Sequence, residues 1–333
     1  MRNKNSKIKI TASIGEAANC VIIPHKNPDG DALGSSLALN HFLLNKGLNS
    51  LVISPSEYPD FLKWMPGENQ IMNYDKEKES SILKIKKADL IFTLDFNDLS
   101  RAGDMGEIIK ESKGKIVMID HHENPKNYAH EMISQPEIGS TCEIIYDLIK
   151  FIDVKGINSI VASCLYTGIM TDSGSFRYPS TTAKTHKIIS ELINRGAKNF
   201  EIHEKIYDTF SHNRLKLLGI ALKNIEKIEY FPYVIITLSQ KELDSCSFKK
   251  GDTEGFVNYG LNIKGISLSI ILIENKKENI VKLSFRSKGN FFTNIFAEKY
   301  FEGGGHQNAS GGISYESLLK TKKRLIKLLK SHS

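Results

Sequence analysis

The stretch Cys20-Val-Ile-Ile-Pro24-His25-Lys-Asn-Pro-Asp29-Gly-Asp31 joins an apolar run directly to imidazole and carboxylate side chains. A short apolar run that ends in proline and polar residues is typical of a buried strand in a parallel sheet. The residues from Ala32 to Leu39 predict a helix, so the segment is expected to fold as strand, turn and helix. We expect the Asp-Gly-Asp triplet to hold two carboxylates close together on a tight turn, with Gly30 in an unusual backbone conformation. Such a triplet taken alone is more often an ordinary turn.

Acidic or imidazole side chains follow apolar runs at three further places. These are Asp95 after Leu90–Leu94, Asp120-His121-His122 after Ile116–Ile119, and Asp172 after Tyr166–Met170. Ligands of open α/β sheets bind beyond the carboxyl ends of the strands, so side chains from distant positions are expected to converge there. Carboxylate and imidazole ligands without thiolates favour Mn²⁺, Mg²⁺, Co²⁺ or Zn²⁺. The sequence therefore predicts a metal-dependent hydrolase.

Apolar runs alternate with helical patterns in the first half, which predicts βαβ units and a parallel sheet. The predicted strands are residues 20–24, 50–54, 89–94 and 115–119, and the predicted helices are residues 32–46, 101–112, 140–151, 157–170 and 182–195. Residues 200–226 predict a polar helical bridge. In the second half the predicted strands are 234–238, 267–273 and 281–286, and the predicted helices are 293–301 and 315–331. The fold class is therefore α/β, with a parallel-sheet domain at 1–195, a helical linker at 196–226 and a smaller α/β domain at 227–333.

Length and composition are those of an ordinary two-domain globular protein: 333 residues, 40% hydrophobic and 25% charged. We expect a cytoplasmic protein without a membrane span, because no apolar run is long enough and the first residues lack the apolar core of a signal peptide. The four cysteines form no CxxC pair and are interpreted as small apolar residues. Residues 1–190 hold 22 Lys+Arg against 23 Asp+Glu, and the remainder hold 23 against 15. This asymmetry indicates either an anion-facing surface in the second half or simply solvated lysines.

A second polar motif is Gly303-Gly-Gly-His306-Gln-Asn-Ala-Ser-Gly311-Gly312. Triple glycine lets backbone N–H groups approach a phosphate, and His306 could donate to it. The alternative is a glycine-rich turn between two helices. Arg286 ends a predicted strand and is a candidate for bidentate bonds to phosphate. Arg101, just after Asp95, is a further candidate anion contact, with a surface ion pair as the alternative.

Five segments in this order carry a resemblance that covers nearly the whole chain. They are HKNPDGDALGS (25–35), TLDFND (93–98), DHH (120–122), GIMTDSGSFRY (168–178) and GGGHQNASGG (303–312). The chain resembles the DHH phosphoesterase superfamily, and within it the short two-domain nanoRNase/pAp phosphatase (bifunctional oligoribonuclease) type with a DHH-associated C-terminal domain. Two positions depart from the usual pattern: Ser310 stands where a second alanine is common, and Pro125 follows the DHH segment.

The resemblance implies a two-metal site. One Mn²⁺ would be held by His25, Asp29 and Asp95, and the second by Asp31, Asp95, His121 and Asp172, with Asp95 bridging. His122 would face the scissile phosphate, so Asp95 and His122 are the implied catalytic residues. The implied substrate-binding residues are Arg286, His306, Gly303, Gly304, Gly305 and Arg101. Mg²⁺ and Co²⁺ are alternative cations.

The implied reaction is hydrolysis by a hydroxide that bridges the two metals. The expected substrates are short oligoribonucleotides, cleaved to mononucleotides, and 3'-phosphoadenosine 5'-phosphate, cleaved to AMP and phosphate. A homodimer is a possible assembly. The alternatives are a phosphodiesterase of cyclic dinucleotides or of linear products such as pApA, a manganese pyrophosphatase, and a non-catalytic nucleotide-binding regulator.

Overall fold

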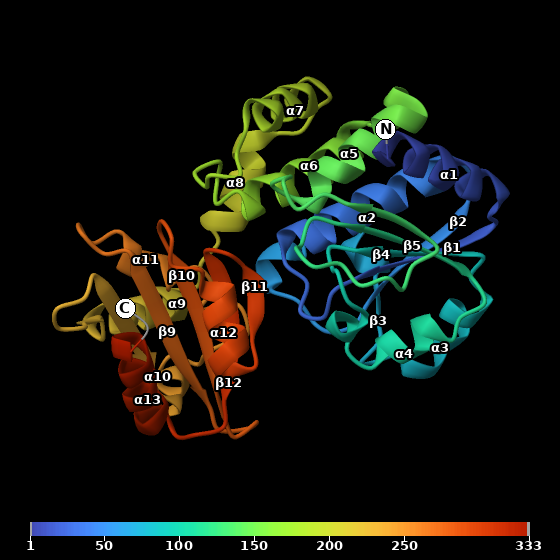
Figure 1. Cartoon of the computed structure of the whole chain (residues 1–333). Coiled ribbons are helices and arrows are strands. Elements are labelled where there is room, and N and C mark those ends of the chain that lie inside the picture. Colours follow the sequence, from blue (N-terminus) through green and yellow to red (C-terminus); the bar gives the residue numbers. More distant parts are fainter. Residues whose placement is uncertain (1, 332–333) are drawn as a thin grey trace. The chain divides into compact units, whose positions relative to one another are not determined.

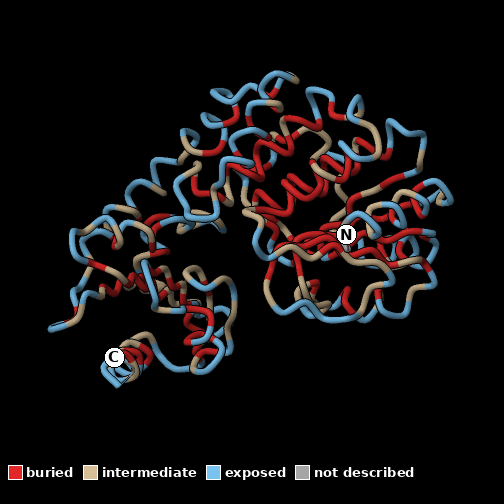
Figure 2. Tube along the Cα trace, turned by 45° about the horizontal axis from the view of Figure 1, so that its top comes forward, coloured by how far each residue is buried: buried red, intermediate tan, exposed pale blue. Residues whose placement is uncertain are grey.

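The computed structural model describes residues 2–331, which divide into two compact units between Thr209 and Phe210. The predicted linker, 196–226, spans this division. Figure 2 shows that buried residues gather in the strands and in the helix faces that pack on them. Within residues 2–331, no helix is both long and apolar enough to cross a lipid bilayer.

The first unit is built on a six-stranded sheet in the order β3-β2-β1-β4-β5-β6, with every neighbouring pair parallel. Its strands are β1 (Asn19–Pro24), β2 (Asn49–Ser54), β3 (Met72–Asn73), β4 (Leu90–Leu94), β5 (Lys115–Asp120) and β6 (Glu131–Ser134). Its α-helices are α1 (Arg2–Glu16), α2 (Gly30–Asn45), α3 (Lys78–Lys87), α4 (Met105–Lys110), α5 (Thr141–Asp153), α6 (Ser159–Asp172), α7 (Ala183–Asn194) and α8 (Asn199–Tyr207). The strand order reverses between β1 and β4, the switch point where ligands bind in open α/β sheets.

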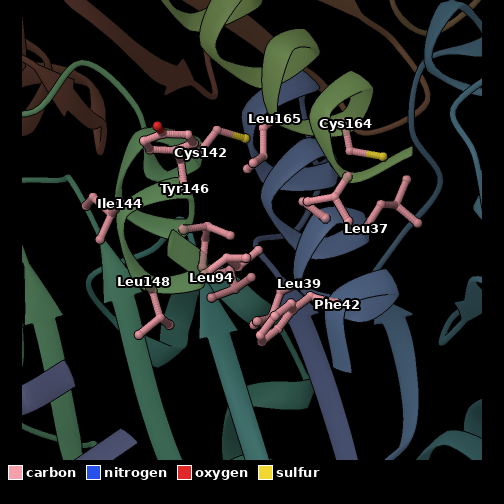
Figure 3. Close-up of a cluster of buried hydrophobic side chains, with 14 of the residues drawn as sticks. Leu37, Leu39, Phe42, Leu94, Cys142, Ile144, Tyr146, Leu148, Cys164 and Leu165 are labelled. Carbon is pink, nitrogen blue, oxygen red and sulfur yellow. The ribbon is translucent and has the colours of Figure 1, made fainter. Parts of the chain in front are cut away.

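Helices cover both faces of this sheet, with α1, α2, α5 and α6 on one side and α3 and α4 on the other (Figure 1). Alternate residues of each strand supply the two cores, because successive side chains point to opposite faces. On β1, for example, Ile22 belongs to the larger core and Ile23 to the smaller one. Figure 3 shows the larger core, where side chains of α2, α5 and α6 meet Leu94 of β4. These contacts fix the helix ends at the carboxyl edge of the sheet.

The second unit contains a mixed six-stranded sheet in the order β11-β12-β10-β9-β8-β7, in which only β8 and β9 run parallel. Its strands are β7 (Glu226–Lys227), β8 (Tyr233–Leu238), β9 (Leu268–Asn275), β10 (Ile280–Ser287), β11 (Gly304–His306) and β12 (Ala309–Ser314). Its helices are α9 (His212–Lys223), α10 (Gln240–Ser245), α11 (Asn258–Leu261), α12 (Thr293–Phe301) and α13 (Leu318–Ser331). Residues of α12 and α13 share a core with one sheet face, and residues of α9 and α10 share a core with the other.

The predicted α/β class and parallel sheet are confirmed, and the predictions for two helical segments are wrong. The helix predicted over 101–112 is a 3₁₀ turn (Leu99–Ala102) followed by α4, because Gly103 takes φ +60° between them. The bridge predicted over 200–226 is two helices, since the hydroxyl of Ser211 caps a new helix by accepting from the N–H of Arg214 at 3.0 Å. The glycine-rich segment lies in the strand pair β11 and β12, so the alternative considered for it, a turn between two helices, does not apply.

Candidate metal centre and active site

The carboxyl ends of β1, β4 and β5 carry the predicted site residues His25, Asp95 and Asp120-His121-His122. Asp29 and Asp31 flank the start of α2, and Asp172 is the last residue of α6. The structure brings these residues together. We call the set His25, Asp29, Asp31, Asp95, His121 and Asp172 the Asp/His cluster.

His25 faces two carboxylates through one ring nitrogen. Its Nε2 lies 3.5 Å from Oδ2 of Asp95 and 3.8 Å from Oδ2 of Asp29. Its Nδ1 lies 2.9 Å from the carbonyl oxygen of Lys26, and because a carbonyl only accepts, Nδ1 carries the proton. In the neutral form of His25, the Nε2 lone pair is therefore the one directed at the carboxylates.

His121 repeats this arrangement beside three acids, one of which, Asp95, also faces His25. Its Nε2 lies 3.4 Å from Asp95, 3.5 Å from Asp172 and 4.0 Å from Asp31. Its Nδ1 lies 3.2 Å from the carbonyl oxygen of Ile138, which again assigns the proton to Nδ1. Asp95 thus stands between the two histidines, with one oxygen toward each.

The local backbone places the carboxylates of Asp95 and Asp29. Asp95 has φ +66°, a left-handed conformation that non-glycine residues adopt at a cost, directly after β4. Asp29 is the N-cap of α2 and accepts from the N–H groups of Asp31 and Ala32, both at 3.0 Å. Gly30 is the first residue of α2 and has no positive φ, contrary to prediction; it is needed because a Cβ there would collide with Thr171.

The N-terminus of α5 supports the cluster, which the sequence prediction missed. The N–H groups of Thr141 and Cys142 donate to the two oxygens of Asp31 at 2.6 and 2.9 Å, and Oγ1 of Thr141 donates to Asp95 at 2.9 Å. Ser140 is the N-cap of this helix, and its side chain accepts from the N–H of Glu143. The relevant pattern in the sequence is the Ser-Thr pair at the helix start. It indicates a helix cap, but it does not indicate that this helix start donates hydrogen bonds to the carboxylates of Asp31 and Asp95.

Burial and mutual charge shift the pKa values within the cluster strongly. Burial, followed by the charges of Asp95 and Asp172, raises the pKa of Asp31 well above its usual range. Burial likewise raises the pKa of Asp172 to about 7. Burial opposes protonation of His25, but Asp29 and Asp95 outweigh it and raise its pKa to about 10. His121 shows the same balance, and its pKa is raised well above the usual range.

These properties fit a divalent cation site. Four carboxylates packed together in a largely buried position repel one another, and protons on the histidines compensate only part of that charge. Atoms that ligate one cation at about 2.1 Å lie about 3 to 4 Å apart, and the separations between the histidine nitrogens and the carboxylates are of that size. Potential ligand atoms of His25, Asp29 and Asp95 lie within 4.8 Å of one another, as do those of Asp31, Asp95 and His121.

His122 is held differently from the other two histidines. Its Nδ1 lies 2.7 Å from Oδ1 of Asp120, and its backbone N–H donates to Oδ2 of the same carboxylate at 3.1 Å. Asp120 is completely buried. The ring of His122 is therefore fixed through Nδ1.

The predicted phosphate contacts in the second unit form an ordered group. Arg286 on β10 pairs with Ala309 on β12, which pairs with His306 on β11, so the three residues form one row on one sheet face. Packing explains two of the three glycines: a Cβ at Gly303 would collide with the carbonyl of Gly311, and one at Gly305 would lie 2.6 Å from the carbonyl of Ala309. At Gly304 the nearest atom would be 3.9 Å away, so packing does not require glycine there.

Arg101 lies in the first unit, in the 3₁₀ turn after β4. Its carbonyl accepts from the N–H of Lys26 at 2.7 Å, which ties this turn to the residue after His25. The Arg101 side chain is half-buried and makes no hydrogen bond or ion pair within residues 2–331.

Comparison with known proteins agrees with this geometry. The chain matches the N-terminal domain of the DHH family over residues 19–169 and the DHHA1 domain over residues 218–331. The bifunctional oligoribonuclease and PAP phosphatase NrnA of Thermus thermophilus is 28% identical over 307 residues, which cover 92% of this chain and 87% of that protein. The cyclic-di-AMP phosphodiesterase GdpP of Bacillus subtilis is 26% identical over 336 residues, which cover 94% of this chain and 47% of GdpP.

A solved structure is similar over the whole chain. The crystal structure of an exopolyphosphatase-related protein from Bacteroides fragilis has a TM-score of 0.95 at 40% sequence identity, covering 99% of this chain and 96% of that one. The chain therefore belongs to the DHH family, with an N-terminal DHH domain followed by a DHHA1 domain.

Proposed function

We propose that this protein is a Mn²⁺-dependent phosphoesterase that hydrolyses short oligoribonucleotides to mononucleotides, 3'-phosphoadenosine 5'-phosphate to AMP and phosphate, or both. The observation that carries the proposal is the Asp/His cluster at the switch point of the parallel sheet, with its donor set of oxygen and imidazole nitrogen. The name of the Thermus thermophilus relative, an oligoribonuclease and PAP phosphatase, supports the substrate class.

Two cations would share the cluster. His25, Asp29 and Asp95 would hold one, and Asp31, Asp95, His121 and Asp172 the other. When bound, the cations would lower the pKa of the attacking water and neutralise charge on the phosphoryl oxygens. The chain prepares both ligand sets, since carbonyl groups fix the ring orientation of His25 and His121 and the start of α5 fixes Asp31.

His122 would act on the substrate through Nε2. The carboxylate of Asp120 holds the Nδ1 proton, orients the ring and stabilises its positive charge once Nε2 is protonated. A protonated Nε2 can donate to a phosphoryl oxygen or pass its proton to the leaving oxygen. Asp95 would serve both cation sites and in that sense is the second catalytic residue.

The second unit would supply the contacts that select nucleotides. Arg286 offers a planar fork of donors for a phosphate, and His306 offers a further donor in the same row. Gly304 would let the backbone approach the phosphate closely, since its missing Cβ has no packing explanation. Arg101 would add an anion contact beside the cluster. In this proposal the domain roles are metal binding for 1–195, linkage for 196–226 and substrate binding for 227–333.

The deciding experiment is a substrate panel with purified protein and Mn²⁺. The panel contains 3'-phosphoadenosine 5'-phosphate, RNA of two to five nucleotides, cyclic dinucleotides with linear pApA, and pyrophosphate. Release of AMP or mononucleotides from the first two, absent in chelator and absent in Asp95→Ala, is the expected result. The similarity to GdpP makes cyclic dinucleotides the second candidate substrate, and their exclusive cleavage would replace the proposed substrate class.

A fold control accompanies the panel. Asp29→Ala and Asp95→Ala are expected to keep the circular dichroism spectrum of the wild type while losing turnover. Full activity of either variant in saturating Mn²⁺ would exclude the two-cation scheme, and failure of the wild type on every substrate would exclude the enzyme itself.

A further inference from the structure

The chain makes an unusual turn directly after Asp172. Gly174, Ser175 and Phe176 have φ of +57°, +60° and +66°, three left-handed residues in succession, of which two carry side chains. Left-handed backbone is costly for residues with a Cβ, most of all for a bulky one such as phenylalanine. Strain of this kind persists where the surrounding structure enforces it, and it concentrates at functional sites.

Local contacts enforce the turn. The hydroxyl of Ser173 accepts from the N–H of Phe176 at 3.0 Å, and the Phe176 ring packs near Tyr166 and His186, with centroids 6.0 and 5.9 Å away. A Cβ on Gly174 would collide with the ring of Tyr178. The turn is therefore a defined structure and determines where the next residue, Arg177, emerges.

Arg177 is exposed, and its side chain is nevertheless anchored. Its Nε donates to the carbonyl oxygen of Gly174 at 2.8 Å, which fixes the plane of the guanidinium. Within the described part of the chain, its terminal nitrogens make no other hydrogen bond or ion pair. An oriented guanidinium with free donors is suited to bidentate binding of a phosphate.

The segment that carries Arg177 follows the Asp/His cluster at one end and packs at the other end against the loop that supports the cluster. Gly174 follows Asp172 by two residues, so their Cα atoms lie at most about 7.6 Å apart. At the other end, the carbonyl of Ser180 lies 3.1 Å from the position of a Cβ on Gly139. Gly139 lies between Ile138, which holds His121, and Ser140, the cap of the helix that holds Asp31.

We propose that Arg177 binds a second phosphate of the substrate, one that is not hydrolysed. This inference rests on the proposed function and adds to it a preference for substrates with at least two phosphates. In this proposal the cluster takes the phosphate that reacts, whereas Arg177 offers its positive charge from the segment of residues 174–180 that follows Asp172. Arg177 is thus a specificity residue: it strengthens binding of a nucleotide that carries an additional phosphate.

The test compares two ligands that differ by one phosphate, the RNA dinucleotides pApA and ApA. KM and kcat are measured with saturating Mn²⁺ for the wild type, Arg177→Met and Arg177→Lys. We expect Arg177→Met to raise KM for pApA about 10-fold, with kcat and both constants for ApA unchanged, because a hydrogen-bonded charge pair contributes that much. Arg177→Lys keeps the positive charge but lacks the forked donors of the guanidinium. Its KM for pApA is therefore expected to lie between the values of the wild type and Arg177→Met. Equal effects on pApA and ApA, or none, would overturn the proposal.

A binding measurement separates this proposal from the proposed reaction. Calorimetry with pApA and ApA is carried out on His122→Ala and on His122→Ala/Arg177→Met, where the Asp/His cluster is intact and turnover is reduced. We expect His122→Ala to bind pApA more tightly than ApA, and the double variant to bind both dinucleotides equally. If the double variant kept the same preference for pApA, the role of Arg177 would be contradicted. Lys187→Met, at an exposed position of α7, removes one charge outside the turn and is expected to leave every constant unchanged. If the wild type were inactive but still bound pApA more tightly than ApA, and lost this preference in Arg177→Met, the proposed hydrolysis would be contradicted while the binding role of Arg177 would stand.

Discussion

The Asp120 carboxylate holds His122 by two hydrogen bonds, one from the ring Nδ1 at 2.7 Å and one from the backbone N–H at 3.1 Å. Both oxygens of a completely buried acid are thus committed to one neighbouring residue. His25 and His121 instead direct Nδ1 at backbone carbonyls and Nε2 at carboxylates. This difference separates His122 from the two candidate ligands.

Asp120→Asn should lower kcat and leave the affinity for Mn²⁺ close to that of the wild type. An amide has one acceptor oxygen, so one of the two bonds to His122 is lost and the ring is less well oriented. Loss of such a supporting partner typically costs about 10- to 100-fold. Steady-state kinetics and metal titration test this, with the exposed Asp104→Asn as control. A loss of metal affinity without loss of kcat would make Asp120 a support of the ligands instead.

Thr141→Val should weaken metal binding, because it removes the hydroxyl that donates to Asp95 at 2.9 Å and keeps the shape of the side chain. The backbone N–H of residue 141 continues to hold Asp31, so the effect isolates Asp95. We expect about a 10-fold loss of Mn²⁺ affinity by calorimetry. Thr141→Ser retains the hydroxyl and should bind Mn²⁺ like the wild type; equal losses in both variants would point to packing and not to the hydrogen bond.

The sequence was sufficient to predict which residues meet, and it was insufficient to predict what supports them. Apolar runs that end in Asp or His predict strand ends, and parallel strands present those ends at one edge, so convergence of His25, Asp95 and His121 followed from topology. The donors to Asp31 come from a helix that begins 110 residues later. No local pattern encodes that contact, because it depends on how α5 packs beside α2.

Two other features of the structure could not be predicted from the sequence, each for a different reason. The three left-handed residues after Asp172 include Ser175 and Phe176, types that do not signal positive φ as glycine does. The strand pair β11–β12 contains several glycines, which are depleted in strands, and here close packing of the two backbones requires some of them. Propensity favours a loop there, and tertiary contacts override it.

Mn²⁺ should stabilise the wild type far more than Asp172→Asn. Excess cation at 100 times its dissociation constant adds about 2.7 kcal/mol to a folded state that binds it. Asp172→Asn removes one candidate ligand and one charge from a set of mutually repelling carboxylates. In chelator, the melting temperature of Asp172→Asn should therefore equal or exceed that of the wild type. Addition of Mn²⁺ should raise the melting temperature of Asp172→Asn only slightly. Asp75→Asn, exposed on a turn, serves as control; an undiminished increase in Asp172→Asn would remove Asp172 from the ligand set.

Glu143→Gln should stabilise the protein at pH 8 and not at pH 4. Burial raises the pKa of Glu143, whose carboxylate accepts from the hydroxyl of Thr185 at 3.1 Å. Since the folded-state pKa lies above the unfolded value, the contribution of Glu143 to stability is complete below the unfolded pKa and is lost as the pH rises through the folded one. Glutamine has no charge to bury and keeps an oxygen for Thr185. Denaturant unfolding at several pH values should show the difference growing with pH, and a constant difference would contradict the shifted titration.

Gly168→Ala should destabilise the first unit and weaken metal binding together. Gly168 lies in α6 against α2, where a Cβ would collide with Sγ of Cys142 and lie 3.0 Å from Cα of Asp31. Neither neighbour can move freely, because Cys142 donates its backbone N–H to Asp31 at 2.9 Å. Overpacking of this kind costs about 1–3 kcal/mol, and the displaced Asp31 should lower Mn²⁺ affinity as well.

Gly219→Ala is the matched control for this crowding. Gly219 lies within α9, and a Cβ there meets no atom within 4 Å, so alanine should stabilise that helix by about 0.5–1 kcal/mol. Denaturant unfolding and metal titration of both variants separate the effects of crowding from those of helix propensity. A gain in stability for Gly168→Ala, like the gain expected for Gly219→Ala, would contradict this prediction. It would mean that the close approach of α6 does not position the Asp31 carboxylate.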